Sequence, residues 1–187
     1  MATAILLHLH QKQEMNILTS MSRINTFILD VDGVLTNGNI LVLESGEMAR
    51  QMNVKDGYAL QLAIKKGYRI FIVSGSSPSA VERRLNNLGI QDIFFKVQDK
   101  RKFIEKLIQQ YQLNEAEILF MGDDMPDLPV FKTVGLCCCP ADAIPEIRDA
   151  ADYISPQKGG EGCVREVIEK VMKINGDWGV STAVAST

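Results

Sequence analysis

The chain has 187 residues, of which 46% are hydrophobic and 23% charged, proportions that are ordinary for one globular domain. Its formal net charge of −3 excludes a broad basic surface for nucleic acid or anionic lipid. No window approaches the roughly 20 apolar residues of a membrane span. The sequence also lacks a recognisable secretory signal, so we expect a cytoplasmic protein.

The two ends of the chain differ from the region between them. Residues 1–22 contain a short apolar run and both histidines, and they are expected to form a poorly ordered leader or an extra helix. Residues 176–187 are mostly small and polar, which is typical of a flexible tail. Residues 23–175 contain no linker or internal repeat, so we expect a single domain there.

The apolar residues 27–29 lead directly into Asp30-Val31-Asp32-Gly33. Such a run, ended by a turn signal, is typical of a buried strand in a parallel sheet. Because alternate residues of a strand share a face, Asp30 and Asp32 start on the same side. Two adjacent carboxylates need a cation, a shared proton or bulk water, and Mg²⁺ suits them when a phosphate is also present. Taken alone, this spacing also fits a solvated turn without a ligand.

A hairpin is predicted next, at about residues 38–53. Residues 40–44 form its first strand, Ser45 and Gly46 its turn, and residues 47–53 the antiparallel return. An isolated hairpin is only marginally stable in water. We therefore expect its apolar side chains to be buried against another subunit.

Helices and strands alternate through the rest of the chain. Asp56 is a candidate N-cap for a helix that ends near residue 66. Further helices are predicted at residues 79–88, 100–111 and 164–174, and strands at residues 69–73, 93–95, 118–121, 135–139 and 153–154. This alternation predicts an α/β fold with a mostly parallel sheet. The consecutive cysteines 137–139 are interpreted as small apolar residues of a buried strand, because no zinc-ligand spacing accompanies them.

Polar groups follow four of the predicted strands, and the carboxyl ends of parallel strands meet at one edge of a sheet. The set fits phosphoryl transfer. Asp30 would attack phosphorus to give an aspartyl-phosphate, and Asp32 would transfer the protons. Asp123 would complete a Mg²⁺ site with Asp30 and Asp32, while Ser74 and Lys100 would hold the phosphoryl oxygens. Each of these residues has an ordinary structural explanation when it is considered singly, but their common position favours one site.

These motifs resemble those of the haloacid dehalogenase-like phosphatases. The matching stretches are residues 30–36 (DVDGVLT), Ser74-Gly75, Lys100 and residues 122–127, and the resemblance covers about residues 25–175. It implies a Mg²⁺-dependent aspartyl-phosphate mechanism. It also implies a Rossmann-like three-layer sandwich in which the small inserted hairpin takes the place of a cap domain.

Within that superfamily the chain resembles the capless phosphatases of 3-deoxy-D-manno-octulosonate 8-phosphate. The hairpin, residues 53–58, Arg84 and residues 159–167 carry this resemblance. It implies a phosphorylated 3-deoxy-ulosonic acid of lipopolysaccharide synthesis as substrate. It further implies a homotetramer in which neighbouring hairpins and C-terminal segments cover each site. The substrate-binding residues that it implies are Gly33, Asn53, Lys55, Asp56, Gly57, Gly75 and Arg84.

Some positions depart from the pattern of that group. The group usually has arginine where this chain has Lys55 and Ser76, and often another near Gln61. Arginine binds a carboxylate through a bidentate fork that lysine cannot reproduce. The reaction is therefore better supported than the sugar acid. A nine-carbon keto-deoxy sugar phosphate or another small phosphate monoester is the alternative substrate.

Two other classes of function remain open. A receiver-like signalling domain also groups aspartates, a hydroxyl and a lysine around Mg²⁺, but its phospho-aspartate should persist, whereas Asp32 is positioned to activate water. A catalytically silent assembly module could use the hairpin as an interface. The presence of Asp30, Asp32, Lys100 and Asp123 together argues against that third class.

Overall fold

A six-stranded parallel sheet forms the centre of the computed structural model, which describes residues 17–78 and 80–179. Its strands, from one edge to the other, are β5 (Asp92–Phe94), β4 (Arg69–Val73), β1 (Thr26–Leu29), β6 (Ile118–Met121), β7 (Leu136–Cys139) and β8 (Tyr153–Ile154). The central strand β1 pairs in parallel with both β4 and β6, and its last residue, Leu29, lies beside Ile72 and Met121. The three strands therefore end together, which brings the residues that follow them to one edge.

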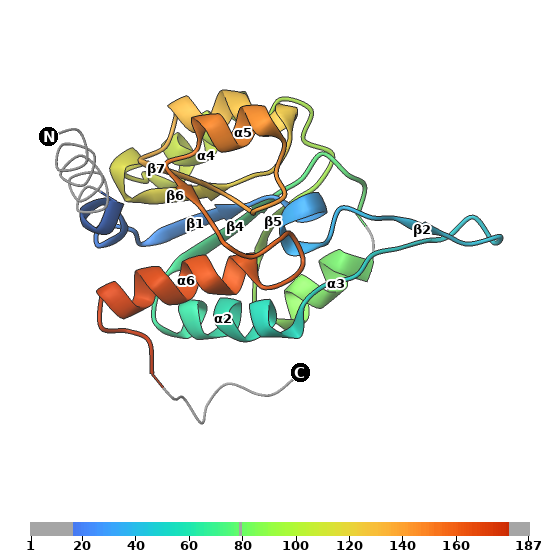
Figure 1. Ribbon diagram of the computed structural model, residues 1–187, viewed down its shortest axis with the longest axis horizontal. Helices are drawn as coiled ribbons and strands as arrows, with labels where there is room; N and C mark the ends of the chain where they lie inside the picture. The colour runs from blue at the N-terminus through green and yellow to red at the C-terminus, as the bar shows by residue number, and fades with distance from the viewer. Residues whose placement is uncertain (1–16, 79, 180–187) are drawn as a thin grey trace, which may run out of the picture.

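Helices cover both faces of this sheet (Figure 1). On one side lie α2 (Val54–Lys65), α3 (Ala80–Asn87) and α6 (Cys163–Ile174), and on the other α4 (Lys100–Tyr111) and α5 (Pro145–Ala150). Two 3₁₀ segments, η2 (Glu115–Glu117) and η3 (Met125–Lys132), flank β6. The predicted Rossmann-like three-layer α/β fold is confirmed.

Alternating side chains of β1 supply both halves of the core. Phe27 and Leu29 pack with the side chains of α2 and α6, while Ile28 packs with Phe71 and Phe120 against α4. All four cysteines are buried free thiols. The interpretation of residues 137–139 as apolar core positions is thus confirmed.

The start of α2 corrects one prediction. Asn53, not Asp56, is its N-cap, and the Asn53 side chain accepts a hydrogen bond from the Lys55 backbone N–H at 2.8 Å. Asp56 lies inside the first turn, where its Oδ1 accepts from the backbone N–H of Arg165 at 2.7 Å. The carboxylate of Asp56, which the local sequence predicts as the N-cap of α2, therefore makes a tertiary contact with α6 instead.

Both ends of the described chain contact the domain. Residues 17–21 are helical, and Met21 is fully buried. At the other end the Tyr68 hydroxyl donates to Asp177 at 2.9 Å, and the Trp178 ring packs edge-on against Tyr58. The expected leader and tail otherwise fall on residues 1–16, including both histidines, and residues 180–187, which lie outside the described residues.

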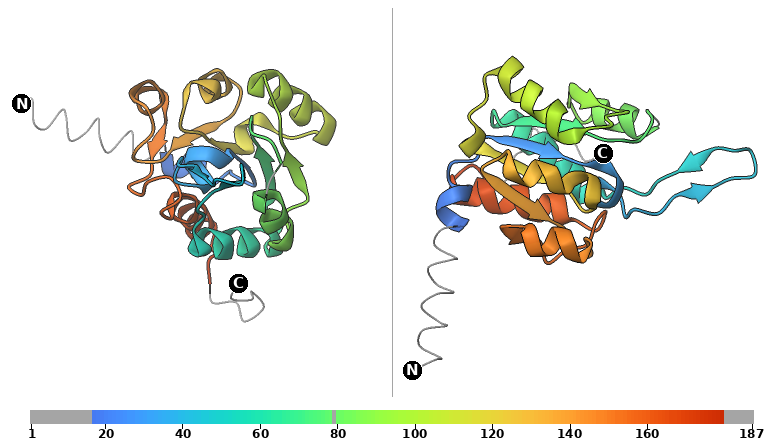
Figure 2. Two further views of the ribbon diagram at one scale, coloured as in Figure 1. Left: turned by 90° about the vertical axis from the view of Figure 1, so that its right-hand side faces the viewer. Right: turned by 90° about the horizontal axis from the view of Figure 1, so that it is seen from above.

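The inserted hairpin projects from the body of the domain (Figures 1 and 2). Its strands β2 (Leu41–Val42) and β3 (Met48–Ala49) pair antiparallel, as predicted, but the paired segment is shorter than expected. Its apolar side chains are open to solvent, with Leu41 63% and Val42 68% exposed. Among the described residues, no helix is long and apolar enough to cross a bilayer.

Candidate active site

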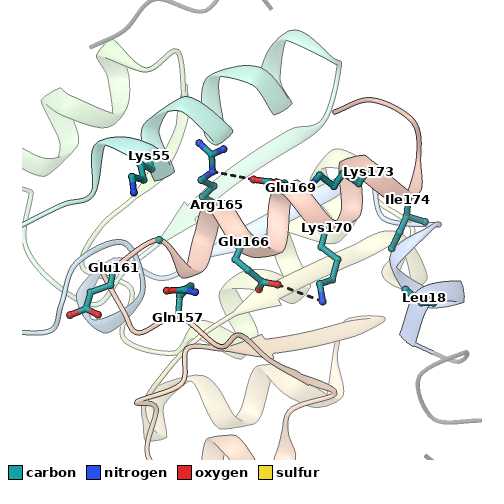
Figure 3. A pocket seen from close by; sticks show the side chains of 11 residues that line it. Leu18, Lys55, Gln157, Glu161, Arg165, Glu166, Glu169, Lys170, Lys173 and Ile174 are labelled. Atoms are coloured by element: carbon teal, nitrogen blue, oxygen red, sulfur yellow. Dashed lines mark hydrogen bonds and ion pairs between the residues drawn. The ribbon is translucent and has the colours of Figure 1, made fainter. Parts of the chain in front are cut away.

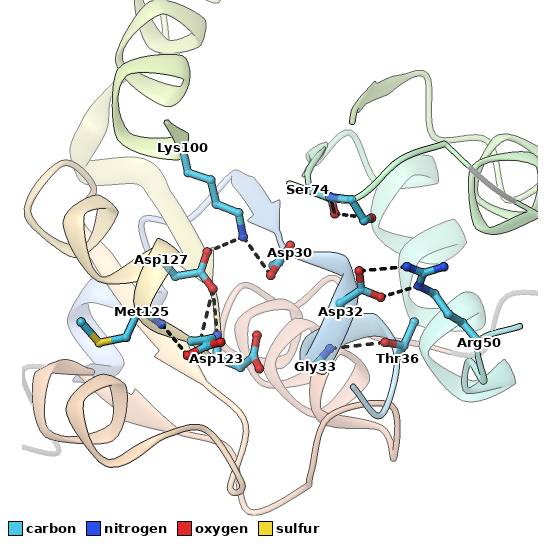
Figure 4. Close-up of polar contacts among 12 residues, drawn as sticks. Asp30, Asp32, Gly33, Thr36, Arg50, Ser74, Lys100, Asp123, Met125 and Asp127 are labelled. Carbon is cyan, nitrogen blue, oxygen red and sulfur yellow. Dashed lines mark hydrogen bonds and ion pairs between the residues drawn. The ribbon is translucent and has the colours of Figure 1, made fainter. Parts of the chain in front are cut away.

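A cavity of about 540 Å³ lies at the carboxyl edge of the sheet. Its lining includes all five side chains expected to take part in the chemistry, namely Asp30, Asp32, Ser74, Lys100 and Asp123. They come from segments that follow β1, β4 and β6 and from the first residue of α4. The convergence of these segments on one site, as the sequence predicts, is therefore present in the structure (Figure 4).

Lys100 pairs with two carboxylates inside this cavity. Its Nζ lies 2.8 Å from Oδ2 of Asp30 and 2.6 Å from Oδ1 of Asp127, and all three side chains are less than a tenth exposed. Burial alone would lower the pKa of Lys100, but the charges of Asp30 and Asp127 outweigh it and raise that pKa above its usual value. The lysine is thus a fixed cation beside the expected nucleophile.

Three carboxylates form a possible cation site next to Lys100. Ligand oxygens of Asp30, Asp123 and Asp127 all lie within 4.8 Å of one another. Oδ1 of Asp123 is buried and has no hydrogen-bond partner among the described residues. Burial, and then the charges of Asp30 and Asp127, raise the pKa of Asp123 to about 7. All of these ligand atoms are carboxylate oxygens, and one of them lacks a hydrogen-bond partner among the described residues. Hard divalent cations prefer such ligands, so these residues fit Mg²⁺.

The carboxylate of Asp32 lies outside this cluster, so the expected metal set of Asp30, Asp32 and Asp123 stays a prediction. The Nε atom of Arg50 donates to Asp32 Oδ1 at 2.6 Å, and Nη2 donates to Oδ2 at 3.4 Å. This two-point ion pair turns the Asp32 side chain toward the hairpin and away from Lys100 (Figure 4). In the observed cluster, Asp127 provides the third carboxylate.

Ser74 begins a small turn above the nucleophile. It is buried, its hydroxyl shares a 2.8 Å hydrogen bond with the hydroxyl of Ser76, and it accepts from the Ser76 backbone N–H at 3.1 Å. Gly75 follows it and also lines the cavity. Two hydroxyls at this position can donate to phosphoryl oxygens.

Gly33 lets the turn after β1 approach the acidic cluster. Its φ is +86°, and a Cβ at this position would lie 2.0 Å from Oδ2 of Asp123. Gly159 packs against the other side of the same turn, because a Cβ on that residue would lie 1.9 Å from the Gly33 carbonyl oxygen. Gly33 is therefore placed at the site by close backbone packing.

Apart from Gly75, the expected substrate-binding residues, Gly33 included, do not line the cavity of this single chain. Asn53 caps α2, and Asp56 bonds to α6. Lys55 lines a different depression of about 530 Å³ along α6 (Figure 3). Arg84 lines a cavity of about 650 Å³ between the hairpin and α3, and Gly57 lies against Arg84 and Leu88.

Sequence reasoning placed Asp127 in the motif of residues 122–127 without giving it a role, and it missed Arg50. Besides its pair with Lys100, Asp127 accepts from the backbone N–H of Asp123 at 3.0 Å and so shapes the loop that carries the cluster. Arg50 carries no local signal, because its contact depends on the path of the hairpin.

Comparisons with known proteins agree with this geometry. A family model described as haloacid dehalogenase-like hydrolase matches residues 89–168. The 3-deoxy-D-manno-octulosonate 8-phosphate phosphatase KdsC of Salmonella typhi is 34% identical over 161 residues, which are 86% of each protein. The chain belongs to the haloacid dehalogenase-like hydrolases. The shared name of its curated relatives places it among the phosphoric monoester hydrolases of that family.

Solved structures of haloacid dehalogenase-like hydrolases have the same fold. The 3-deoxy-D-manno-octulosonate 8-phosphate phosphatase of Yersinia pestis superimposes with a TM-score of 0.84 at 32% identity, covering 87% of this chain and 88% of that one. The corresponding enzyme of Moraxella catarrhalis, solved with magnesium, phosphate and KDO, gives 0.83 at 31% identity, covering 86% and 92%. The likeness therefore extends over nearly the whole length of both proteins.

Proposed function

We propose that this hydrolase is a Mg²⁺-dependent phosphatase of a phosphorylated 3-deoxy-ulosonic acid, with 3-deoxy-D-manno-octulosonate 8-phosphate as the first candidate. The observation that carries the proposal is that two neighbouring carboxylates pair with two different cationic side chains. Asp30 lies beside Lys100 and the acidic cluster, whereas Asp32 pairs with Arg50. One carboxylate is thus positioned for attack and the other for proton transfer.

The reaction would proceed in two steps. In the first, an oxygen of Asp30 bonds to phosphorus, the bond to the sugar oxygen breaks, and Asp32 gives that oxygen a proton. In the second, Asp32 takes a proton from water as the water attacks phosphorus and Asp30 leaves. Lys100 and Ser74 would hold the phosphoryl oxygens. Mg²⁺ bound by Asp30, Asp123 and Asp127 would supply charge neutralisation for the phosphoryl group.

The substrate is proposed from the relatives. Proteins named for 3-deoxy-D-manno-octulosonate 8-phosphate share about a third of their residues with this chain over most of its length. A nine-carbon keto-deoxy sugar phosphate is the second candidate, because Ser76 and Lys55 depart from the arginines of the eight-carbon group. Placing the enzyme in lipopolysaccharide synthesis depends on the first candidate.

A phosphate-release screen tests both levels of this proposal. Sugar phosphates that include the eight- and nine-carbon ulosonates are incubated with the full chain, with and without Mg²⁺. We expect a clear preference for an ulosonate and no turnover by Asp30→Asn. Comparable activity on small unrelated phosphates would remove the sugar-acid assignment, and unchanged turnover by Asp30→Asn would remove the mechanism. A long-lived phosphoprotein would instead favour a receiver-like role.

Self-association through the hairpin is part of the proposal. The exposed apolar side chains Leu41, Val42 and Met48 need a partner surface, and a homotetramer of this chain would supply one. Light scattering should report a tetramer, and Val42→Asp should reduce it to smaller species. A wild-type monomer at all concentrations would contradict the assembly. The four free cysteines agree with the reducing cytoplasm that we propose as its location.

A further inference from the structure

We propose that Arg50 is a positioning residue for the second half of the reaction. It would hold the carboxylate of Asp32 in place to accept the proton of the attacking water. This inference depends on the proposed phosphatase function, and it assigns part of the chemistry to the hairpin, which carries Arg50 just after β3.

The contact between Arg50 and Asp32 fixes both side chains. Arg50 reaches both carboxylate oxygens, at 2.6 Å and 3.4 Å, and its side chain is only 10% exposed. Two donors of a planar guanidinium restrict the rotation of a carboxylate in a way that one donor cannot. The geometry therefore fixes the position of both Asp32 oxygens, which the attack by water requires.

The two carboxylates have separate cations. Lys100 contacts Asp30 and Asp127, whereas Asp32, 33% exposed at its side chain, pairs with Arg50 among the described residues. Loss of Arg50 should thus disturb Asp32 while leaving the nucleophile and the acidic cluster with their own partners. This separation makes the two half-reactions distinguishable by mutation.

Backbone contacts tie the hairpin to the turn that carries Asp32. An antiparallel bridge pairs Thr36 with Met52, two residues after Arg50. The Thr36 hydroxyl accepts from the backbone N–H groups of Gly33 and Gly38 at 3.3 Å and 3.4 Å. Arg50 is consequently held at a defined place relative to Asp32. A shift of the hairpin would therefore also move the carboxylate of Asp32.

The ion pair also lies between two cavities. Asp32 lines the cavity of the catalytic aspartates, and Arg50 lines the one between the hairpin and α3. After the first step the sugar departs and water must take its place beside Asp32. In the second step the oxygen of that water bonds to phosphorus, the bond from phosphorus to Asp30 breaks with its electron pair returning to Asp30, and the water proton passes to Asp32. Because Asp32 is already held in place, less entropy is lost in reaching this arrangement.

Arg50→Gln and Arg50→Lys in the full chain with Mg²⁺ test the proposal, with p-nitrophenyl phosphate as substrate. Its good leaving group needs no acid, so the first step stays fast. For Arg50→Gln we expect kcat to fall about 10- to 100-fold, which is part of the roughly 10²- to 10⁴-fold that positioned proton transfer contributes. Since kcat/KM covers only the steps through phosphorylation, it should be unchanged. A burst of nitrophenol and acid-stable trapping of phosphoenzyme should accompany the lower kcat.

Controls separate this role from a structural one. Arg50→Lys keeps the charge with a single donor group and should recover part of kcat and shrink the burst. Arg69→Gln removes an exposed arginine at the opposite end of β4 and should behave as wild type. A parallel loss of kcat and kcat/KM without a burst, or wild-type kinetics of Arg50→Gln, would overturn the proposal, as would a loss confined to alkyl phosphates.

The proposed function fails by a different result. A wild-type enzyme that hydrolyses p-nitrophenyl phosphate but no ulosonate phosphate removes the substrate assignment and leaves the Arg50 experiment decisive. A wild-type protein that releases phosphate from neither substrate overturns both. Thermal unfolding of each variant, compared with wild type, identifies any loss of activity caused by misfolding.

Discussion

The Nζ atom of Lys100 lies 2.8 Å from Oδ2 of Asp30, the residue expected to attack phosphorus. The same nitrogen lies 2.6 Å from Asp127. An unpaired buried charge costs several kcal/mol, so one buried ammonium stabilises two carboxylates that would otherwise repel each other. Within the acidic cluster of Asp30, Asp123 and Asp127, Asp123 has a buried oxygen without a hydrogen-bond partner among the described residues, so it is well placed to bind an added cation.

Replacing Lys100 should therefore destabilise the fold and stop the reaction. For Lys100→Met we expect a loss of about 3–5 kcal/mol in the free energy of unfolding without Mg²⁺, because the change removes one partner of a buried ion pair. Mg²⁺ should restore part of this loss, since it supplies positive charge to the same carboxylates. Urea denaturation with and without Mg²⁺ measures both effects.

Lys102→Met is the matched control for that variant. Lys102 is 78% exposed at its side chain and pairs with Asp99 at 3.1 Å on the surface of α4. Exposed pairs contribute about 0–1 kcal/mol, so this change should have little effect. If Lys100→Met were as stable as Lys102→Met, the ion pairs of Lys100 would not support the fold in the way that its burial indicates.

Adding a methyl group at Gly33 should impair metal binding. An alanine Cβ would lie 2.0 Å from Oδ2 of Asp123, so that carboxylate must move. We expect Gly33→Ala to weaken Mg²⁺ binding by about 10- to 100-fold, the usual scale when the support of a ligand is lost. Calorimetric titration with Mg²⁺ measures this affinity directly.

Gly46→Ala separates the steric effect from backbone strain. Gly46 has a similar φ of +84°, but a Cβ there meets nothing within 4 Å. Both variants incur about 1–2 kcal/mol for a left-handed alanine, but only Gly33→Ala displaces Asp123. Equal Mg²⁺ affinities in the two variants would contradict the proposed crowding of Asp123.

The parts of the molecule that depend on local pattern could be predicted. The continuous apolar run before Asp30 identified β1, and the parallel pairing of β1 with β4 and β6 follows from strand and helix alternation. The convergence of Asp30, Ser74 and Asp123 then follows from the topology. Lys100 was found because it opens the helix that follows β5, at the same edge of the sheet.

The remaining features depend on tertiary packing that periodicity does not encode. Asn53 and Asp56 are equally suited to cap a helix, and only the approach of α6 assigns Asp56 to the Arg165 backbone. Arg50 meets Asp32 only because the hairpin returns beside the turn after β1. Lys55 and Arg84 line other depressions of the single chain, so their substrate role depends on contacts beyond it.

The stabilising effect of Mg²⁺ should grow with pH. The pKa of Asp123 is raised from 3.8 to about 7, mainly by burial and then by Asp30 and Asp127. Because the folded-state value lies above the unfolded one, the metal-free protein loses stability as the pH rises from about 4 to about 7. Mg²⁺ binds the ionised form, so its increase in Tm should be larger at about pH 8 than at about pH 5.

Thermal unfolding with and without Mg²⁺ across this range checks the effect. Asp123→Asn removes the titrating group and should abolish most of the Mg²⁺-dependent increase in Tm at high pH. An increase in Tm that does not vary with pH would show that protons and Mg²⁺ do not compete for these carboxylates.

Asp56 should make the fold less stable as the pH rises. Burial raises the pKa of Asp56 from 3.8 to about 6, although the Arg165 backbone N–H and then the Arg165 charge oppose the shift. The folded state favours the protonated form of Asp56. The stability that this form contributes is therefore present below about pH 4 and is lost as the pH rises through about 6. Asn resembles the protonated form. Relative to wild type, Asp56→Asn should therefore gain on the order of 2 kcal/mol between about pH 4 and pH 7.

Urea denaturation of both proteins at several pH values measures this difference, and Asp99→Asn provides a control of opposite sign. Asp99 is an exposed N-cap, and its hydrogen bonds from the backbone and then the side chain of Lys102 lower its pKa. The stability that Asp99 contributes is present above its unfolded pKa and is lost as the pH falls through the lower folded value. Asp99→Asn should thus lose stability relative to wild type at neutral pH, and Asp56→Asn should gain it.

A constant difference between Asp56→Asn and wild type at every pH would contradict this prediction. It would show that Asp56 is ionised in the folded state at no cost, because water or a charge reaches it.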